Sequence, residues 1–284
     1  MHSMLLIERK PLQVLKPQSG WAVLDLREIW QFRNLLLTLA ARDLKLRYRQ
    51  TALGPVWVVL GPLLSAGVLS FVFGKIANLP SEGVPYFLFL FAGQQAWNVF
   101  NNTLGRIGGS LVGNAHLVSK VYFPRMVLPL STIFSTLVDL GVALALLVVL
   151  MIVLHVAPTA ALLLLPVWLI LLLAFAMGIG LIIAALTVTY RDAGGFIAPL
   201  LSAMMYLSPV LYSVTAMPQS LRPFLPFYYL NPMASLIQGF RWSLLGTSAP
   251  PWGYVVYAAV LSFAVLAAGM FAFRSMERKF ADVI

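Results

Sequence analysis

Long uncharged, apolar stretches alternate with short polar segments along this chain of 284 residues. A helix of about 20 apolar residues crosses a hydrocarbon core roughly 30 Å thick. The uncharged run from Leu140 to Tyr190 is 51 residues long, so it must hold two such helices. We place the break at Pro158, because proline is tolerated at the start of a helix but not in its interior. The pattern therefore predicts an all-α integral membrane protein with six spans, over residues 54–76, 84–105, 128–154, 160–188, 196–214 and 252–273.

Two further segments are apolar but do not fit a span. After a tail over residues 1–24, residues 25–51 carry apolar side chains at helical spacing with Arg and Lys on the other flank, which predicts an amphipathic helix along the membrane interface. A plain anchor with no further role fits that pattern equally well. Residues 215–250 hold five prolines among aromatic residues. We expect short re-entrant helices there, because broken backbone at membrane depth needs protein or water to satisfy it. Residues 52–284 would then form one transmembrane domain.

The composition excludes a soluble globule and most metal chemistry. Hydrophobic residues make up 61% of the chain and charged residues only 10%, against about 25% charged in an ordinary soluble domain. The chain has no cysteine, so it has neither a disulfide nor a thiolate metal site. Its three histidines lie far apart in the sequence, and we predict no metal site.

The placement of the positive charges predicts the orientation in the membrane. A net charge of +10 would suggest nucleic acid as the partner of a soluble chain, but nine of the nineteen basic residues precede the first apolar run. With both termini on one side, sixteen basic residues lie on that side and three on the other. Basic loops stay in the cytoplasm. We therefore predict cytoplasmic termini, a multi-pass protein of the cytoplasmic (inner) membrane in contact with its lipids, and no nucleic-acid partner.

One face of the second expected span is lined with amides. Gln94, Asn98 and Asn101 recur at helical spacing beside Trp97. Amides in lipid need partners, so this face either packs against other helices or lines a polar path. Neutral amides beside aromatic rings suit an uncharged, hydroxylated cargo such as a sugar better than an ion. The expected path adds aromatic residues from spans 1 and 5, namely Trp57, Tyr206 and Tyr212.

Two other features remain open on the sequence alone. Asp139 is the only acid inside an apolar run, and a hydrogen-bonded partner within the bundle is favoured over a cargo or gating group. The basic loop over residues 106–125 is either a simple connector or a short surface helix on which a partner protein pushes. No phosphate-binding loop and no nucleophile elbow occur in the chain, so we expect neither ATP binding nor catalytic residues in it.

Several stretches, in order along the chain, resemble one family: the membrane subunits of ABC-2-type exporters of cell-surface polysaccharides. The most specific is Arg42-Asp-Leu-Lys-Leu-Arg-Tyr-Arg-Gln-Thr-Ala-Leu-Gly-Pro-Val-Trp57, followed by Pro62-Leu-Leu64. The others are Lys120-Val-Tyr-Phe-Pro-Arg125, Tyr190-Arg-Asp192, Ser208-Pro-Val-Leu-Tyr212, Tyr229-Leu-Asn-Pro-Met233 and Gly239-Phe-Arg241. The resemblance runs from about residue 25 to the C-terminus.

This resemblance implies a homodimer that works with two copies of a separate ATPase, which would bind the ATP and Mg²⁺. Lipid-linked polysaccharide would pass between the two permease copies, with O-antigen the favoured glycan. Capsule, teichoic acid, lipid and drug permeases of the same class remain alternatives, as does an ATP-independent channel. The residues expected to receive the push of the ATPase are Arg42, Arg47, His116, Leu117, Lys120 and Tyr122. The residues expected at an outer gate are Pro226, Tyr229, Asn231 and Pro232.

Overall fold

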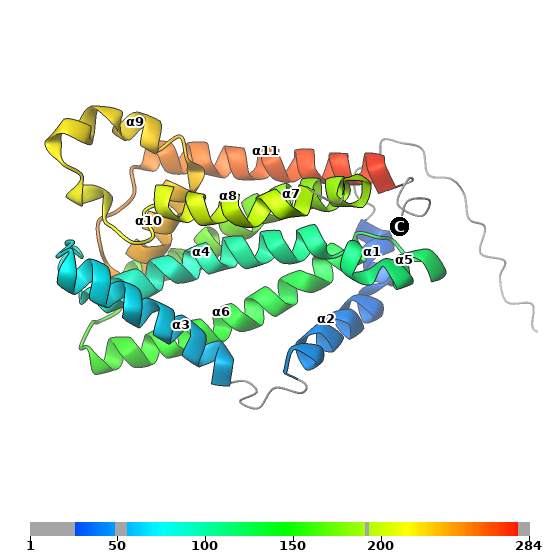
Figure 1. The fold of residues 1–284 in the computed structure, drawn as a ribbon, viewed down its shortest axis with the longest axis horizontal. Coiled ribbons are helices and arrows are strands. Elements are labelled where there is room, and N and C mark those ends of the chain that lie inside the picture. Colours follow the sequence, from blue (N-terminus) through cyan, green and yellow to red (C-terminus); the bar gives the residue numbers. More distant parts are fainter. Residues whose placement is uncertain (1–25, 49–55, 191–192, 278–284) are drawn as a thin grey trace, which may run out of the picture.

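The computed structural model describes residues 26–48, 56–190 and 193–277, and all regular structure in these ranges is helical. The expected segment 1–24 lies outside the described residues. Figure 1 shows an elongated bundle whose long helices run roughly along one axis. The helices are α1 (Leu26–Gln31), α2 (Arg33–Tyr48), α3 (Val56–Leu69), α4 (Tyr86–Gly109), α5 (Ala115–Lys120), α6 (Val127–Val153), α7 (Leu165–Thr189), α8 (Ala193–Leu207), α9 (Leu225–Tyr228), α10 (Pro232–Leu245) and α11 (Trp252–Met276).

Four stretches of the described residues are long and apolar enough to cross a membrane. They are Val59–Ile76, where α3 continues into a π-helical stretch, then α6, the stretch Ala160–Thr189 that ends in α7, and α11. The first two residues of the first expected span, 54–76, lie outside the described residues. The other two expected spans correspond to α4, which has 24 residues but carries the amides, and α8, which has only 15.

The expected break between spans 3 and 4 is visible as a turn. Helix α6 ends at Val153, and His155 takes a left-handed conformation with φ of 56°. A short 3-10 helix, Ala160–Leu164, then leads into α7 after Pro158. A proline lacks the N–H that a helix interior needs, so Pro158, together with the left-handed His155, favours a break between the two helices here.

Helix α4 lies at the centre of the fold. It packs against α6, α7 and α10, and sixteen of its 24 residues are buried. The main core joins Leu88 and Phe91 of α4 to Trp168 of α7 and Phe240 of α10. Helix α10 is itself almost wholly buried. The polar residues of α4 are therefore held inside the bundle.

Helices α7 and α11 approach each other closely at two glycines. A Cβ atom on Gly178 would lie 2.5 Å from the backbone of Val265, and one on Gly269 would collide with the carbonyl oxygen of Gly178. Small residues let helix backbones come together where apolar surface alone gives no advantage over lipid. This contact fixes α11 on the bundle.

We expect Gly269→Leu to lower the free energy of unfolding by about 1–3 kcal/mol or more, because the added side chain has no space between α7 and α11. The measurement is the melting temperature of the purified protein in detergent. Ala268→Leu is the matched control, since that neighbour is exposed and its substitution should change the melting temperature little. Equal melting of the two variants would contradict the close contact.

The segment expected as one interface helix is divided into α1 and α2 near Phe32. Leu39 and Ala40 of α2 are buried, and α2 packs against α6. Trp30, Leu37 and Leu46 are instead exposed. Apolar residues thus lie both on the packed side and on the free side, and a lipid surface is a suitable environment for the second group.

Candidate functional site

A cavity of about 1090 Å³ lies between α4, α7 and α8. The α4 side is polar and presents Trp97 and Arg106 together with three amides. The opposite side, from α7 and α8, is mainly apolar. The lining residues used below are Trp97, Asn98, Asn101, Asn102 and Arg106 on α4 and Ile183, Thr187, Val188, Ile197, Leu201 and Met205 on α7 and α8. The arrangement suits an amphipathic molecule.

Three of the seven residues expected along the path line this cavity, namely Trp97, Asn98 and Asn101. Trp57 lines a smaller cavity of about 120 Å³ between α3, α4 and α6, which Asn98 also borders. Tyr206 is exposed on α8, outside both cavities. Tyr212 donates a hydrogen bond of 3.3 Å to the carbonyl of Tyr206 and shares one of 3.1 Å with Tyr228.

The amide face divides into packed and unpartnered residues. Gln94 is buried and donates a hydrogen bond of 2.8 Å to Ser65 on α3, so it joins two helices. Among the described residues, Asn98 makes only a long contact of 3.5 Å with Gln95. Within the described parts of the chain, the structure gives Asn101 and Asn102 no hydrogen-bond partner. Helix packing thus accounts for the amide nitrogen of Gln94, although its buried Oε1 has no partner among the described residues, whereas Asn101 and Asn102 need water or a ligand in the cavity.

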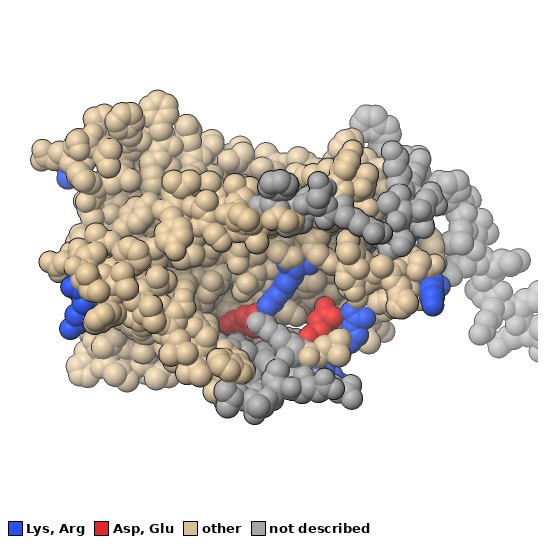
Figure 2. All heavy atoms as spheres, viewed as in Figure 1, with Lys and Arg blue, Asp and Glu red and all other residues tan. Residues whose placement is uncertain are grey.

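Arg106 is a site residue that the sequence analysis missed, because it was counted with the loop that follows span 2. Helix α4 continues past Arg106 to Gly109. The guanidinium of Arg106 forms an ion pair of 2.6 Å with Asp139 on α6. A second bond of 3.2 Å goes to Thr136. The favoured role of Asp139, a partner within the bundle, is therefore the one observed. Figure 2 shows that charges are sparse on this face and gather over α4, α6 and α2.

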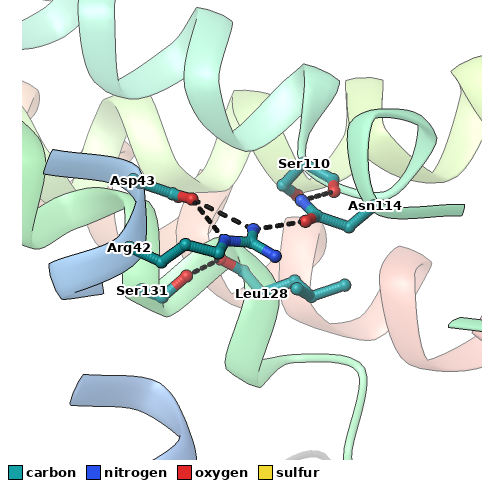
Figure 3. A network of polar contacts seen from close by, with 6 residues as sticks. All are labelled: Arg42, Asp43, Ser110, Asn114, Leu128 and Ser131. Carbon is teal, nitrogen blue, oxygen red and sulfur yellow. Dashed lines mark hydrogen bonds and ion pairs between the residues drawn. The ribbon is translucent and has the colours of Figure 1, made fainter. Parts of the chain in front are cut away.

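At the end where α1, α2 and α5 lie (Figure 1), Arg42 connects α2 to the short segment before α5. Its guanidinium donates to Asn114 at 2.6 Å and pairs with Asp43 at 3.0 Å. Figure 3 shows the guanidinium between these two side chains, while Asn114 in turn donates to the carbonyl of Ser110. A displacement of α2 would therefore be transmitted to the segment before α5, and the reverse.

The expected coupling residues on and beside α5 are accessible. His116, Lys120 and Tyr122 are exposed, and Leu117 is half-buried. Leu117 packs beside the buried Val118, which belongs to the second hydrophobic core of the protein. The side chain of Arg47 lies outside the described residues. Of the two possibilities left open for residues 106–125, a short helix is therefore present, as α5, and its polar side chains are exposed.

The other end of the bundle is organised around Arg241 of α10, which is buried. It donates to the carbonyl oxygens of Phe89 at 3.1 Å, Pro209 at 2.8 Å and Val210 at 2.9 Å. Its guanidinium also lies 3.7 Å from the ring centre of Phe89. Gly93 makes room for it, since a Cβ there would collide with the guanidinium. Arg241 therefore holds the turn after α8 against α4.

Glu82 completes the network at this end. It accepts hydrogen bonds from Ser213 and from both the backbone N–H and the hydroxyl of Ser248. Burial alone would raise the pKa of Glu82, but these hydrogen bonds and the charge of Arg241 outweigh it, so the pKa is lowered. The carboxylate is thus charged at neutral pH and ties the loops around α10 together.

Of the four residues expected at an outer gate, two make side-chain hydrogen bonds and a third begins a helix. Asn231 caps α10 through the backbone N–H of Met233 at 3.0 Å and also donates to Ser208 at 2.9 Å. Tyr229 is buried and donates to Gln238 at 2.8 Å, and Pro232 is the first residue of α10. Pro226 is exposed in α9. Their positions are those of a rigid support, and a gating role stays a prediction.

Known proteins resemble this chain over most of its length. It is 31% identical to the O-antigen export system permease protein RfbA of Myxococcus xanthus, over 91% of this chain and 98% of that protein. It is 26% identical to an RfbA permease of Klebsiella pneumoniae, over 88% and 95%. With the polysialic acid transport protein KpsM of Escherichia coli the identity is 23%, over 83% and 91%. The model of the ABC-2 type transporter family matches residues 34–245, which span α2 to α10, and the chain therefore belongs to this family of membrane transport subunits.

Proposed function

We propose that this protein is the membrane-spanning subunit of an ATP-driven exporter that moves a lipid-linked cell-surface polysaccharide across the cytoplasmic membrane, with O-antigen as the favoured glycan. The observation that carries the proposal is the cavity beside α4, where Trp97 meets amides that have no partner in the described structure. Relatives named as O-antigen export permeases match nearly end to end and support the same reading.

The proposed topology has six spans and cytoplasmic termini. Helix α4 is about 36 Å long at 1.5 Å per residue, enough to cross the hydrocarbon core although its amides lower its hydropathy. Helix α8 reaches only about 22 Å, and the turn over residues 208–213 would complete the crossing. The short helices between α8 and α11 would dip into the outer leaflet.

We further propose a homodimer with two copies of an ATPase, which would supply the ATP and Mg²⁺ chemistry. Helix α5 and its flanks would receive the movement of that ATPase. The hydrogen bond from Arg42 to Asn114 supports this role, because it joins α2 to the α5 segment and would carry a push on one to the other.

We expect single cysteines at His116 and Lys120 to crosslink to the partner ATPase, with yields that change when ATP is added. Both side chains are exposed, and the chain has no native cysteine to give a background signal. The measurement is the crosslinked band in membranes that contain both chains. A cysteine at Leu221, exposed at the opposite end, is the control. Absence of crosslinks from both α5 positions in every nucleotide state would place the contact elsewhere.

The function is tested by reconstituting the purified chain with and without its ATPase and following movement of lipid-linked glycan. We expect export only with both chains and ATP, and no nucleotide hydrolysis by this chain alone. Movement without the ATPase would favour a channel. A cell that lacks this chain should lose surface O-antigen, whereas loss of capsule instead would favour the alternative suggested by a relative named for capsule polysaccharide export.

A further inference from the structure

We propose that the cavity between α4, α7 and α8 binds the anionic phosphate head of a membrane lipid, with Arg106 as its cation and the lipid chain along α7 and α8. This inference rests on the proposed function and deepens it, because it says which part of a lipid-linked cargo this protein holds. It follows from the charge, the unpartnered donors and the shape of one cavity.

Arg106 is the only charged residue among those that line the cavity in the described chain. A guanidinium has five N–H donors, and the bonds to Thr136 and Asp139 use two of them. The planar array of donors matches the oxygens of a phosphate and can bind two of them at once. Arg106 therefore has both the charge and the donors to bind a phosphate from the cavity side.

Asp139 is the resident counterion of this arginine. A partly buried guanidinium without a negative partner is costly, and the ion pair of 2.6 Å compensates the charge of Arg106 when only water fills the cavity. An arriving phosphate has to compete with Asp139 for Arg106. That competition weakens binding, which suits a cargo that must leave again.

Neutral donors lie beside the cation. Asn101 and Asn102 line the same cavity and have no hydrogen-bond partner among the described residues. Each amide offers two N–H donors, and such groups at membrane depth need a polar partner. Phosphate oxygens that remain after contact with Arg106 would accept from these amides.

The remaining wall accounts for the lipid chain. Ile183, Val188, Ile197, Leu201 and Met205 give α7 and α8 an apolar surface opposite the polar face of α4. The cavity volume of about 1090 Å³ slightly exceeds the range of about 300–1,000 Å³ for small-molecule pockets. A head group and the first part of a hydrocarbon chain fit that volume, whereas a free phosphate would leave the apolar wall unused.

The test places the full-length protein in phosphatidylcholine nanodiscs that contain phosphatidic acid with a photoreactive group in one acyl chain. Illumination and peptide mapping should find the label on α7 and α8, and excess unlabelled phosphatidic acid should remove it. Inorganic phosphate should not displace the label. The proposal would be overturned if inorganic phosphate abolished the labelling of the wild type. It would also be overturned if excess unlabelled phosphatidic acid left that labelling unchanged.

Two single variants separate binding from structure. Arg106→Gln should reduce the label about tenfold, because charge-assisted hydrogen bonds are lost. Asp139→Asn should keep or increase the label, because the competing negative charge is removed. If the pair served only to join α4 to α6, both variants would lose the label alike, and that result would overturn the proposal. Arg222→Gln, at an exposed arginine outside the cavity, is the control for loss of one positive charge.

A double variant covers the case in which Arg106→Gln does not fold. Asn101→Leu with Asn102→Leu leaves the Arg106–Asp139 pair intact and should still reduce the label severalfold; undiminished labelling would overturn the proposal. Export with the ATPase is measured on the same wild-type sample. Normal glycan export with labelling that ignores Arg106 would refute this site alone. Labelling that depends on Arg106 without glycan export would instead refute the proposed function.

Discussion

Replacement of Arg241 with methionine is expected to destabilise the protein by about 3 kcal/mol or more and to remove most of it from the membrane. The buried carbonyl oxygens of Phe89, Pro209 and Val210 would lose their donor, and each unsatisfied buried group costs about 1–3 kcal/mol. Methionine has a similar length but no charge and no N–H donor. The measurement is the fraction of protein that stays monodisperse after heating in detergent.

Arg222→Met is the matched control, because Arg222 is exposed at the same end of the bundle. Its substitution should change stability by no more than about 0.5 kcal/mol. Arg241→Lys should lie between the two, since an ammonium keeps the charge but cannot reach all three carbonyls in the same geometry. Wild-type melting of Arg241→Met would show that these hydrogen bonds do not hold the turn after α8.

Helix positions could be predicted where a proline or a charge interrupts an apolar run. Pro158 marks the turn between α6 and α7, and α6 covers Val127–Val153 where residues 128–154 were expected. The expected fifth span, 196–214, shows the limit. Helix α8 ends at Leu207, because Pro209 disfavours helix at the residue before it and distant side chains hold the turn that follows. Those partners, Arg241 and Asn231, are on α10 and just before it, so no local pattern could reveal them.

The end of α4 was hidden for a related reason. Glycines at 105, 108 and 109 suggest the end of a helix, yet α4 continues to Gly109. Gly108 packs where a Cβ would lie 2.8 Å from Ile183 of α7, so tertiary contact outweighs the weak propensity of glycine. This extra turn carries Arg106 into the cavity. The sequence could show that the amides share one face, but not which of them has a partner.

The second large effect is expected on export, from substitutions in the part of the amide face that lines the cavity. Asn98→Leu with Asn101→Leu should leave the protein folded but slow glycan export about tenfold, because the cavity wall loses groups that can replace water around a sliding sugar chain. Asn101→Trp should block export more completely by filling the space between α4 and α8. Surface glycan, normalised to folded permease in the membrane, is the measurement.

Gln94→Leu provides the internal control, because Gln94 lies on the same face but donates to Ser65 and does not line the cavity. Loss of that bond should lower the melting temperature while export per folded molecule stays normal. The two variants should therefore show opposite results. The Asn98 and Asn101 variant should remain stable but export slowly, whereas Gln94→Leu should be less stable but export normally per folded molecule. Normal export from the Asn98 and Asn101 leucine variant would mean that the whole amide face serves only to pack against other helices. The path would then have to be sought at Trp57 and the smaller cavity on the other side of α4.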